Sequence, residues 1–183
     1  AAALTGRTAR YGFHLKENRL GTTRFQLEET PQTWSEWGAL GGLIGNAMGS
    51  YFQVPVVEGF SGKAPTSDDL KHFGAALASY GSTAMYHIVG VTPEAIDLKV
   101  VFDATPPEPV FVNRTDLEAF INSYASDDDN LDVVVFAAPQ LSIMELEKVT
   151  RLLKGRQVHS EVSLLVATSP ENKRAADRFG FTD

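Results

Sequence analysis

The stretch "LDVVVFAAPQLSIMELEKVTRLL" at residues 131–153, together with "VSLLVATSP" at residues 162–170, decides the predicted fold. The first eight residues form an almost continuous apolar run, which is typical of a strand covered on both faces. Ser142 and Glu145 then have the spacing of a capping box, in which both side chains satisfy free N–H groups at a helix start. Because a second apolar run follows this helix, the pattern predicts two parallel strands joined by a crossover helix.

The same alternation extends toward the N-terminus. Capping signals at Thr33 and Thr115 precede apolar residues at helical spacing, another helix is predicted after residues 65–69, and Ser169 followed by Pro170 opens the last helix. The predicted strands are 54–57, 83–90, 109–112, 131–138 and 162–168. Alternating strands and helices of this kind predict an α/β fold with three layers, αβα, around a mostly parallel sheet.

We expect residues 1–183 to form one α/β region. The segment "IDLKVVFDATPPEP" at residues 96–109 fits the alternation least well, because its prolines favour a loop. It is therefore the best candidate for a boundary between two lobes. The acidic segment at residues 127–130 is predicted to be a solvated loop and not a metal site, because no fourth carboxylate lies at ligand spacing.

The composition excludes several classes of function. Of the 183 residues, 43% are hydrophobic and 21% are charged, which is ordinary for a globular protein, and the formal net charge is −7. Because binding to phosphates depends on Lys and Arg, we expect neither nucleic acid nor a membrane as partner of this acidic chain. The absence of cysteine excludes a disulfide framework, a cysteine nucleophile and thiolate metal ligands within this segment. We expect a cytoplasmic protein, which the lack of cysteine allows.

The carboxyl ends of the predicted strands are the expected place for a site, because ligands of open parallel sheets bind there. Residues that start predicted helices at this edge, such as Thr92 and Ser142, also offer free N–H groups that favour anions. His87 has two interpretations, because a single histidine on an apolar strand is more often a hydrogen-bonded core residue than part of a site. The residues expected at this edge are Lys63, His87, Thr92, Gln140, Ser142 and Ser169.

Three longer stretches resemble a known family: "TGRTARYGFHLKENR" at residues 5–19, "DDLKHFGAALASYGSTAMYHIVGVTPEA" at 68–95 and "APQLSIMELEKVTRLLKGRQVHSEVSLLVATS" at 138–169. In content, order and approximate spacing they are similar to the large-subunit region of the aconitase X family, within the aconitase superfamily. The resemblance implies a hydro-lyase, that is a dehydratase, which acts on cis-3-hydroxy-L-proline or a similar small hydroxy acid. Two alternatives stay open: a phosphomevalonate dehydratase large subunit, and a cluster-free or excised α/β domain that only binds a small anionic metabolite.

The resemblance also implies groups that this chain lacks. Family members use an iron–sulfur cluster with cysteine ligands, and where they often read Cys-Pro-His this sequence has Ala138, Pro139 and Gln140. We therefore expect no cofactor in this segment and an iron–sulfur cluster in the full-length family enzyme. The chain resembles a middle segment, so flanking segments or a small subunit are expected to supply the cluster and the base. The segment alone is expected to be inactive.

Candidate residues for binding the substrate come from the three stretches and from the predicted sheet edge. A planar guanidinium suits a carboxylate, so the arginines of the first stretch are candidates for anchoring a hydroxy acid. No metal-ligand spacing exists among the four histidines, and the sequence assigns no catalytic base. The candidate residues are Arg7, His14, Asn18, Arg19, Lys63, His87, Thr92, Gln140, Ser142 and Ser169.

Overall fold

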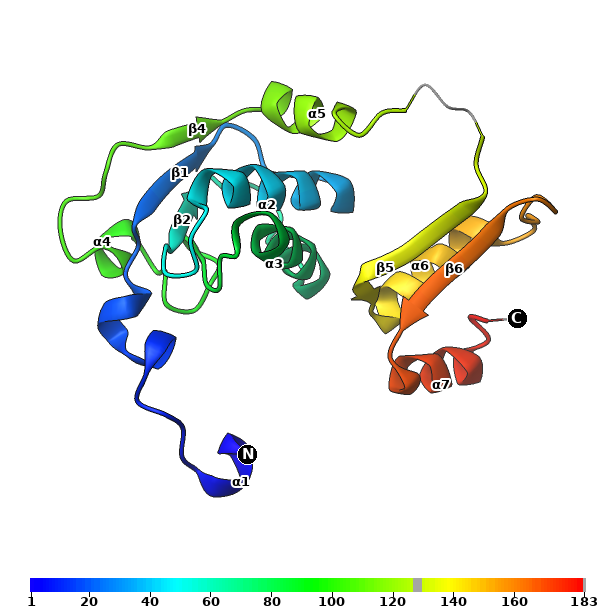
Figure 1. The fold of residues 1–183 in the computed structure, drawn as a ribbon, viewed down its shortest axis with the longest axis horizontal. Helices are drawn as coiled ribbons and strands as arrows, with labels where there is room; N and C mark the ends of the chain where they lie inside the picture. The colour runs from blue at the N-terminus through cyan, green and yellow to red at the C-terminus, as the bar shows by residue number, and fades with distance from the viewer. Residues whose placement is uncertain (127–129, 183) are drawn as a thin grey trace. The chain divides into compact units, whose positions relative to one another are not determined.

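The computed structural model describes residues 1–126 and 130–182. The chain divides into two compact units, residues 1–124 (unit 1) and residues 125–183 (unit 2). Figure 1 shows the ribbon of both units, each of which combines parallel strands with helices. The solvated loop predicted at residues 127–130 lies largely outside the described residues.

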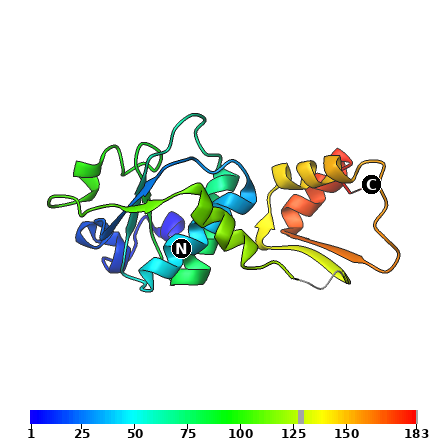
Figure 2. The same ribbon diagram turned by 90° about the horizontal axis from the view of Figure 1, so that it is seen from above.

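Unit 1 is built on a four-stranded parallel sheet with the strand order β3-β2-β1-β4. The strands are β1 (Thr23–Leu27), β2 (Pro55–Glu58), β3 (His87–Ile88) and β4 (Val110–Val112). The parallel pairing confirms the predicted α/β class. Both Figure 1 and Figure 2 show the helices of this unit packed beside the sheet.

The central strand β1 is absent from the predicted set of strands. Its sequence alternates polar and apolar residues, and only Phe25 and Leu27 are buried. The prediction relied on continuous apolar runs, whereas β1 shows the alternation of a strand with one buried face. Phe25 and Leu27 join the core with Leu40, Ile44 and Phe73, which belong to the helices.

Each long helix of unit 1 begins at a residue whose side chain caps it. The helices are α1 (Ala2–Thr5), η1 (Gly12–His14), η2 (Lys16–Arg19), α2 (Trp34–Met48), α3 (Ser67–Gly81), α4 (Leu98–Val101) and α5 (Arg114–Asn122). The predicted capping box of Thr33 and Glu36 is confirmed. The box that starts α5 is formed by Asn113 and Asp116, two residues before the predicted Thr115, because each of these side chains accepts from the other's backbone N–H.

Two predictions about residues 83–92 are wrong. Only His87 and Ile88 of the predicted strand 83–90 pair with a neighbour. Thr92 does not start a helix, because its hydroxyl contacts the backbone N–H and carbonyl of Ile88 in a turn. The segment 96–109 contains α4 and lies inside unit 1, whereas the two compact units divide after Tyr124.

Unit 2 has the strand, helix and parallel strand that the opening stretch predicts. It consists of β5 (Val133–Leu141), α6 (Ile143–Leu153), β6 (Ser163–Thr168) and α7 (Pro170–Phe179). β5 and β6 form a sheet of their own. The single sheet edge expected to hold both His87 and Gln140 therefore does not form, because these residues belong to different sheets.

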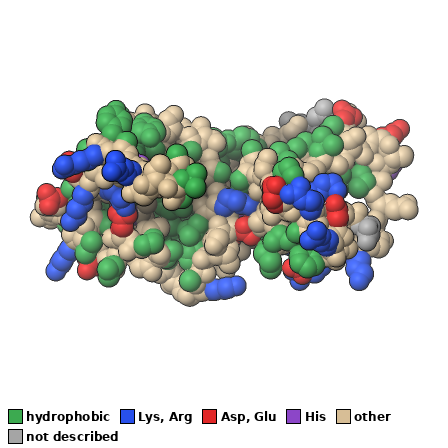
Figure 3. Space-filling view, turned by 90° about the horizontal axis from the view of Figure 1, so that it is seen from below, with side chains coloured by type: hydrophobic (Ala, Val, Ile, Leu, Met, Phe, Trp, Pro, Cys, Tyr) green, Lys and Arg blue, Asp and Glu red, His purple; other side chains and the backbone are tan. Residues whose placement is uncertain are grey.

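The expectation that β5 is covered on both faces is also wrong for this chain. The parallel register places Val133 and Val135 on the same face as Leu165. These three side chains are 46%, 55% and 54% exposed. The space-filling view shows hydrophobic side chains at the surface among charged ones (Figure 3). Among the described residues, no helix has the length and apolar character needed to cross a membrane.

Helices α2 and α3 pack so closely that glycines are required between them. A Cβ added to Gly41 would lie 2.3 Å from the carbonyl oxygen of Phe73, and one added to Gly81 would lie 2.4 Å from the carbonyl oxygen of Gly45. Such contacts are far shorter than van der Waals separations, so the backbones could not approach to this distance with side chains between them. This packing positions α3, which leads the chain into β3 and His87.

We predict that Gly41→Ala lowers the free energy of unfolding by about 1–3 kcal/mol, because the added methyl group forces α2 away from α3. Gly38→Ala is the matched control, since nothing lies within 4 Å of a Cβ at that position of the same helix. The control should raise the free energy of unfolding by about 0.5–1 kcal/mol through helix propensity. Urea denaturation of the three proteins tests this, and equal effects of the two substitutions would contradict the packing argument.

Candidate functional site

His87 in unit 1 is almost completely buried although its side chain is polar. Its side chain is 1% exposed, and its Nε2 lies 2.7 Å from the backbone carbonyl oxygen of Arg19. A carbonyl oxygen can only accept, so Nε2 carries the hydrogen and Nδ1 of the neutral ring carries a lone pair. Among the hydrogen bonds of residues 1–126 and 130–182, none reaches this buried Nδ1. His87 is thus tied to the N-terminal segment through one nitrogen and presents an unused acceptor with the other.

The surroundings of His87 favour its neutral form. Burial lowers the pKa of His87 below its ordinary value of 6.5, and the nearby Arg19 guanidinium acts in the same direction. The hydrogen bond to the Arg19 carbonyl opposes them by favouring a protonated ring. The net direction is downward, so at neutral pH the ring is uncharged and Nδ1 remains an acceptor.

Arg19 approaches His87 from the helix η2, and its side chain forms an ion pair with Glu94 through Nη2. The two side chains are 33% and 46% exposed. The Nε atom of Arg19 is buried and has no hydrogen-bonding partner among the residues that the structure describes. Of the Nε–H and Nη2–H groups that a guanidinium can offer together to one carboxylate, Arg19 thus uses only Nη2–H.

Two pockets lie at this cluster. The first has a volume of about 580 Å³ and is lined by Arg19 and His14 together with the aromatic rings of Phe13, Tyr51 and Phe52. The second has a volume of about 320 Å³, and its lining residues are Ala84, Met85, Tyr86, His87, Thr92, Pro93 and Glu94. The ion pair joins a residue of the first pocket to a residue of the second.

The cluster lies at the amino ends of the strands and not at their carboxyl ends. Arg19 precedes β1, and His87 is the first residue of β3, opposite Val56 near the start of β2. In the described part of the chain, four buried polar side-chain atoms lack a partner: Arg19 Nε, Gln53 Oε1, Thr83 Oγ1 and His87 Nδ1. All four residues lie at or just before the start of β1, β2 or β3, which are neighbours in the sheet. Because buried polar groups normally have partners, this edge has hydrogen-bonding capacity left for a ligand or water.

The structure brings some of the predicted residues to this cluster and leaves others apart. His14 lines the first pocket and lies 3.3 Å from the hydroxyl of Thr8 through Nε2. Asn18 donates to the carbonyl of Gly12 at 2.9 Å and so holds the turn before Arg19. Arg7 is exposed near the N-terminus and lines neither pocket, and Lys63 is exposed in the loop after β2.

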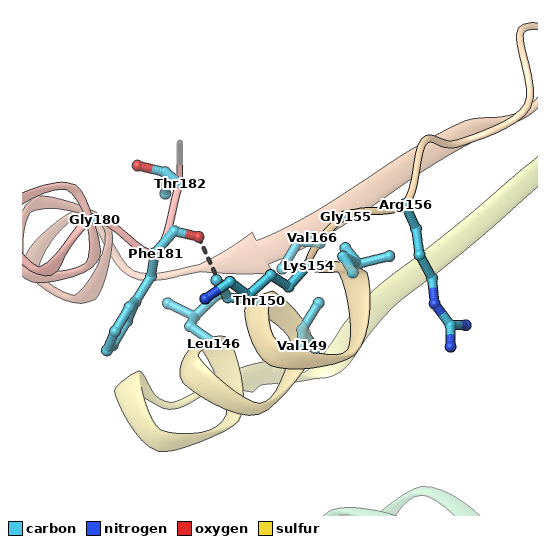
Figure 4. Close-up of a pocket in the computed structure, with 11 residues that line it drawn as sticks. Leu146, Val149, Thr150, Lys154, Gly155, Arg156, Val166, Gly180, Phe181 and Thr182 are labelled. Carbon is cyan, nitrogen blue, oxygen red and sulfur yellow. Dashed lines mark hydrogen bonds between the residues drawn. The ribbon is translucent and has the colours of Figure 1, made fainter.

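The predicted candidates of unit 2 lie at the starts of its helices and in β5. Ser142 and Ser169 are the N-caps of α6 and α7, and Gln140 lies in β5. None of them lines the pocket of about 600 Å³ in this unit, which Leu146, Val149 and other residues form (Figure 4). Figure 4 shows the side chain of Arg156 pointing away from Leu146 and Val149, which belong to the apolar part of this pocket.

The residues of this chain do not fit an iron–sulfur cluster. The sequence contains no cysteine, and thiolates are the ligands that hold such clusters. Within residues 1–126 and 130–182, no group of three or more His, Asp or Glu side chains is placed to hold a metal ion. We therefore derive no chemical step through such a group from this chain.

Glu94 lines the second pocket, and Gln53 and Thr83 have unpartnered buried atoms before β2 and β3, yet none of the three is among the candidate residues named from the sequence. The prediction examined residues after strands, because ligands of parallel sheets are expected there. Glu94 lay within the second family-like stretch and follows a Thr-Pro pair, which was the available signal. Gln53 and Thr83 carry no local pattern, since their role depends on which strands become neighbours.

We predict that the free energy of unfolding falls as the pH drops below 6.5, and that His87→Gln removes part of this fall. The unfolded chain takes up a proton at the ordinary pKa, whereas the buried ring does so only at a lower pH, so acid favours the unfolded state. The slope from this one group is at most about 1.4 kcal/mol per pH unit. Denaturation curves between about pH 7 and pH 5 test this, with His159→Gln at an exposed position as control. Parallel pH profiles for all three proteins would contradict it.

Family profiles of two consecutive domains match this chain. The aconitase X second domain matches residues 21–122, and the aconitase X third domain matches residues 131–183. The boundary between the two matches agrees with the division into units 1 and 2.

Relatives of known sequence and structure cover almost the whole chain. The phosphomevalonate dehydratase large subunit of Methanothermobacter thermautotrophicus is 37% identical over 100% of this chain and 43% of the relative. The cis-3-hydroxy-L-proline dehydratase of Hypocrea jecorina is 34% identical over 99% of this chain and 31% of the relative. The crystal structure of Thermococcus kodakaraensis aconitase X in its holo-form matches with a TM-score of 0.84 and 30% identity, over 99% of this chain and 45% of that one.

The chain thus spans less than half the length of these three proteins, and the two relatives matched by sequence are named as a dehydratase and as the large subunit of a dehydratase. The two family profiles account for most of its residues, and the solved structure has the same fold. This chain belongs to the aconitase X family.

Proposed function

We propose that the chain is part of a hydro-lyase that dehydrates cis-3-hydroxy-L-proline or a similar small hydroxy acid. The observation that carries this proposal is the membership in a family whose matching relatives are dehydratases, over nearly the whole chain. The cluster of Arg19, His87 and Glu94 adds a chemical reason. It combines a guanidinium, which suits a carboxylate, with a neutral imidazole that can accept from a hydroxyl.

The cluster can bind and orient a substrate but does not complete the reaction. Elimination of water needs a base at the acidic C–H and a Lewis acid or proton donor at the leaving hydroxyl. We propose that flanking segments or a small subunit supply these groups together with the iron–sulfur cluster of the family, because this chain contains no cysteine. The cytoplasmic location remains part of this proposal.

The site residues outside the cluster have supporting roles in the proposal. His14 extends the first pocket, and Asn18 holds the turn that presents Arg19. Thr92 shapes the second pocket from the turn after β3. Five candidates line neither pocket of this cluster and have no assigned contact with the substrate in this proposal: Arg7, Lys63, Gln140, Ser142 and Ser169.

A second candidate substrate is 5-phosphomevalonate. The phosphomevalonate dehydratase large subunit of Methanothermobacter thermautotrophicus is 37% identical to the chain, against 34% for the Hypocrea jecorina proline enzyme. The small difference favours neither substrate decisively, so both compounds belong in the same assay.

We predict that the natural-length protein that contains this chain, with its small subunit if separate, forms a product lacking one water from cis-3-hydroxy-L-proline. The 183-residue chain alone should form none, because the base and the cluster lie elsewhere. Mass spectrometry of the reaction measures the product, and 5-phosphomevalonate in a parallel reaction identifies the second candidate. Dehydration of neither compound by the natural-length protein would refute the proposed function, and dehydration by the chain alone would refute the need for further segments.

A further inference from the structure

We propose that Glu94 occupies, on Arg19, the position that a ligand carboxylate takes, and that opening this ion pair lets a ligand hydroxyl donate to Nδ1 of His87. The inference rests on the proposed function and assigns to each residue the part of the ligand that it recognises. In this inference, Glu94 competes with the ligand carboxylate for the guanidinium of Arg19. Arg19 and His87 are the residues that select the ligand.

The first support is the incomplete pairing of Arg19. A carboxylate binds a guanidinium best through two parallel hydrogen bonds. Glu94 is paired with Nη2 of Arg19, while the Nε–H of the same group is buried and has no partner among the described residues. A ligand carboxylate that engages both Nε and Nη2 would satisfy a donor that Glu94 leaves unused.

The second support is the fixed orientation of His87. Its Nε2–H is committed to the carbonyl of Arg19 at 2.7 Å, so the ring cannot turn its donor toward a ligand without losing this bond. Nδ1 remains as an acceptor in a side chain that is 1% exposed. An unpaired buried acceptor is unfavourable, and a hydroxyl donor would relieve it.

The third support is that the ion pair can open easily. Both side chains are partly exposed to solvent, and exposed ion pairs contribute little to stability. Arg19 lines the pocket of about 580 Å³, whereas Glu94 and His87 line the pocket of about 320 Å³. A ligand carboxylate that replaces Glu94 on Arg19 would take the place of a residue that lines the same pocket as His87.

The ligand class follows from these groups. A carboxylate is required for the Nε and Nη2 edge of Arg19, and a hydroxyl on a nearby carbon is required for Nδ1 of His87. cis-3-Hydroxy-L-proline has both groups, and L-proline has only the carboxylate. The pair of compounds therefore separates the contribution of Arg19 from that of His87.

The first test measures the binding of cis-3-hydroxy-L-proline to the 183-residue chain by titration calorimetry. Glu94→Gln should tighten binding about three- to fivefold, which is the range expected for removing an exposed competing ion pair. Glu108→Gln, which removes the same charge at an exposed position outside both pockets, should leave the affinity unchanged. Arg19→Lys should weaken binding, because it retains the charge but loses the two-bond geometry.

The second test compares the two compounds on His87→Gln. The Gln amide nitrogen can keep a donor on the Arg19 carbonyl, and its carbonyl oxygen then lies on the Cδ2 side of the former ring, so no acceptor remains at the position of Nδ1. The wild-type chain should prefer cis-3-hydroxy-L-proline over L-proline by about three- to tenfold, as expected for one hydrogen bond. The variant should bind the two compounds equally, with its affinity for L-proline unchanged. In the wild-type chain, the ¹⁵N resonance of His87 Nδ1 should move with cis-3-hydroxy-L-proline and not with L-proline.

Several results would overturn the inference. Binding that is no tighter in Glu94→Gln than in Glu108→Gln would exclude the competition, and a hydroxyl preference that survives His87→Gln would exclude the acceptor role. Absence of binding to every variant would show that these residues form no site in this chain. The dehydration assay of the natural-length protein is independent of these titrations. An active enzyme with negative titrations would therefore reject only this inference and keep the proposed function.

Discussion

The hydrogen bond from Nε2 of His87 to the carbonyl of Arg19 joins two parts of unit 1 that are far apart in sequence. It connects the N-terminal helices η1 and η2 to the start of β3, and the ion pair between Arg19 and Glu94 lies at the same place. Figure 1 shows the N-terminal segment reaching the sheet where β1 begins. Because the bond fixes which ring nitrogen carries the hydrogen, the same contact that ties the segment down also determines what His87 offers to a ligand.

The position of His87 depends in turn on the packing of α2 against α3. Glycines 41, 45 and 81 let the two helices approach closely, and the residue after α3 takes a left-handed conformation before the chain turns toward β3. The core residues Leu40, Ile44, Phe73 and Leu77 fill the space between these helices and the sheet. A displacement of α3 would therefore shift the strand that carries His87, even though none of these three glycines lines either pocket of the site.

The α/β class, most strands and the caps of α2, α6 and α7 could be predicted from the sequence, because they rest on local patterns. The capping box of Thr33 and Glu36 is one example, and the strand, helix and strand of unit 2 are another. β1 was missed because its burial alternates along the strand. The division into two sheets could not be predicted, since apolar runs show that a strand is buried but not which strand lies beside it.

The candidate site was predicted only in part, for the same reason. Arg19 and His87 were recognised as candidates, but His87 was expected at the carboxyl edge of one continuous sheet and no contact between the two residues was predicted. The contact between them depends on the segment before β1 folding back to the start of β3, a long-range pairing that no spacing in the sequence encodes. The unused atoms of Gln53 and Thr83 became apparent only once β1, β2 and β3 were known to be neighbours.

The most direct test of this account determines the tautomer and charge of His87 in the ligand-free chain. Both can be read from long-range ¹H–¹⁵N correlations of the imidazole at neutral pH. We expect a neutral ring with the hydrogen on Nε2 and a free lone pair on Nδ1. A ring that carries its hydrogen on Nδ1 could not donate from Nε2 to the Arg19 carbonyl, and a charged imidazolium could not accept from a ligand hydroxyl, so either result would contradict the account.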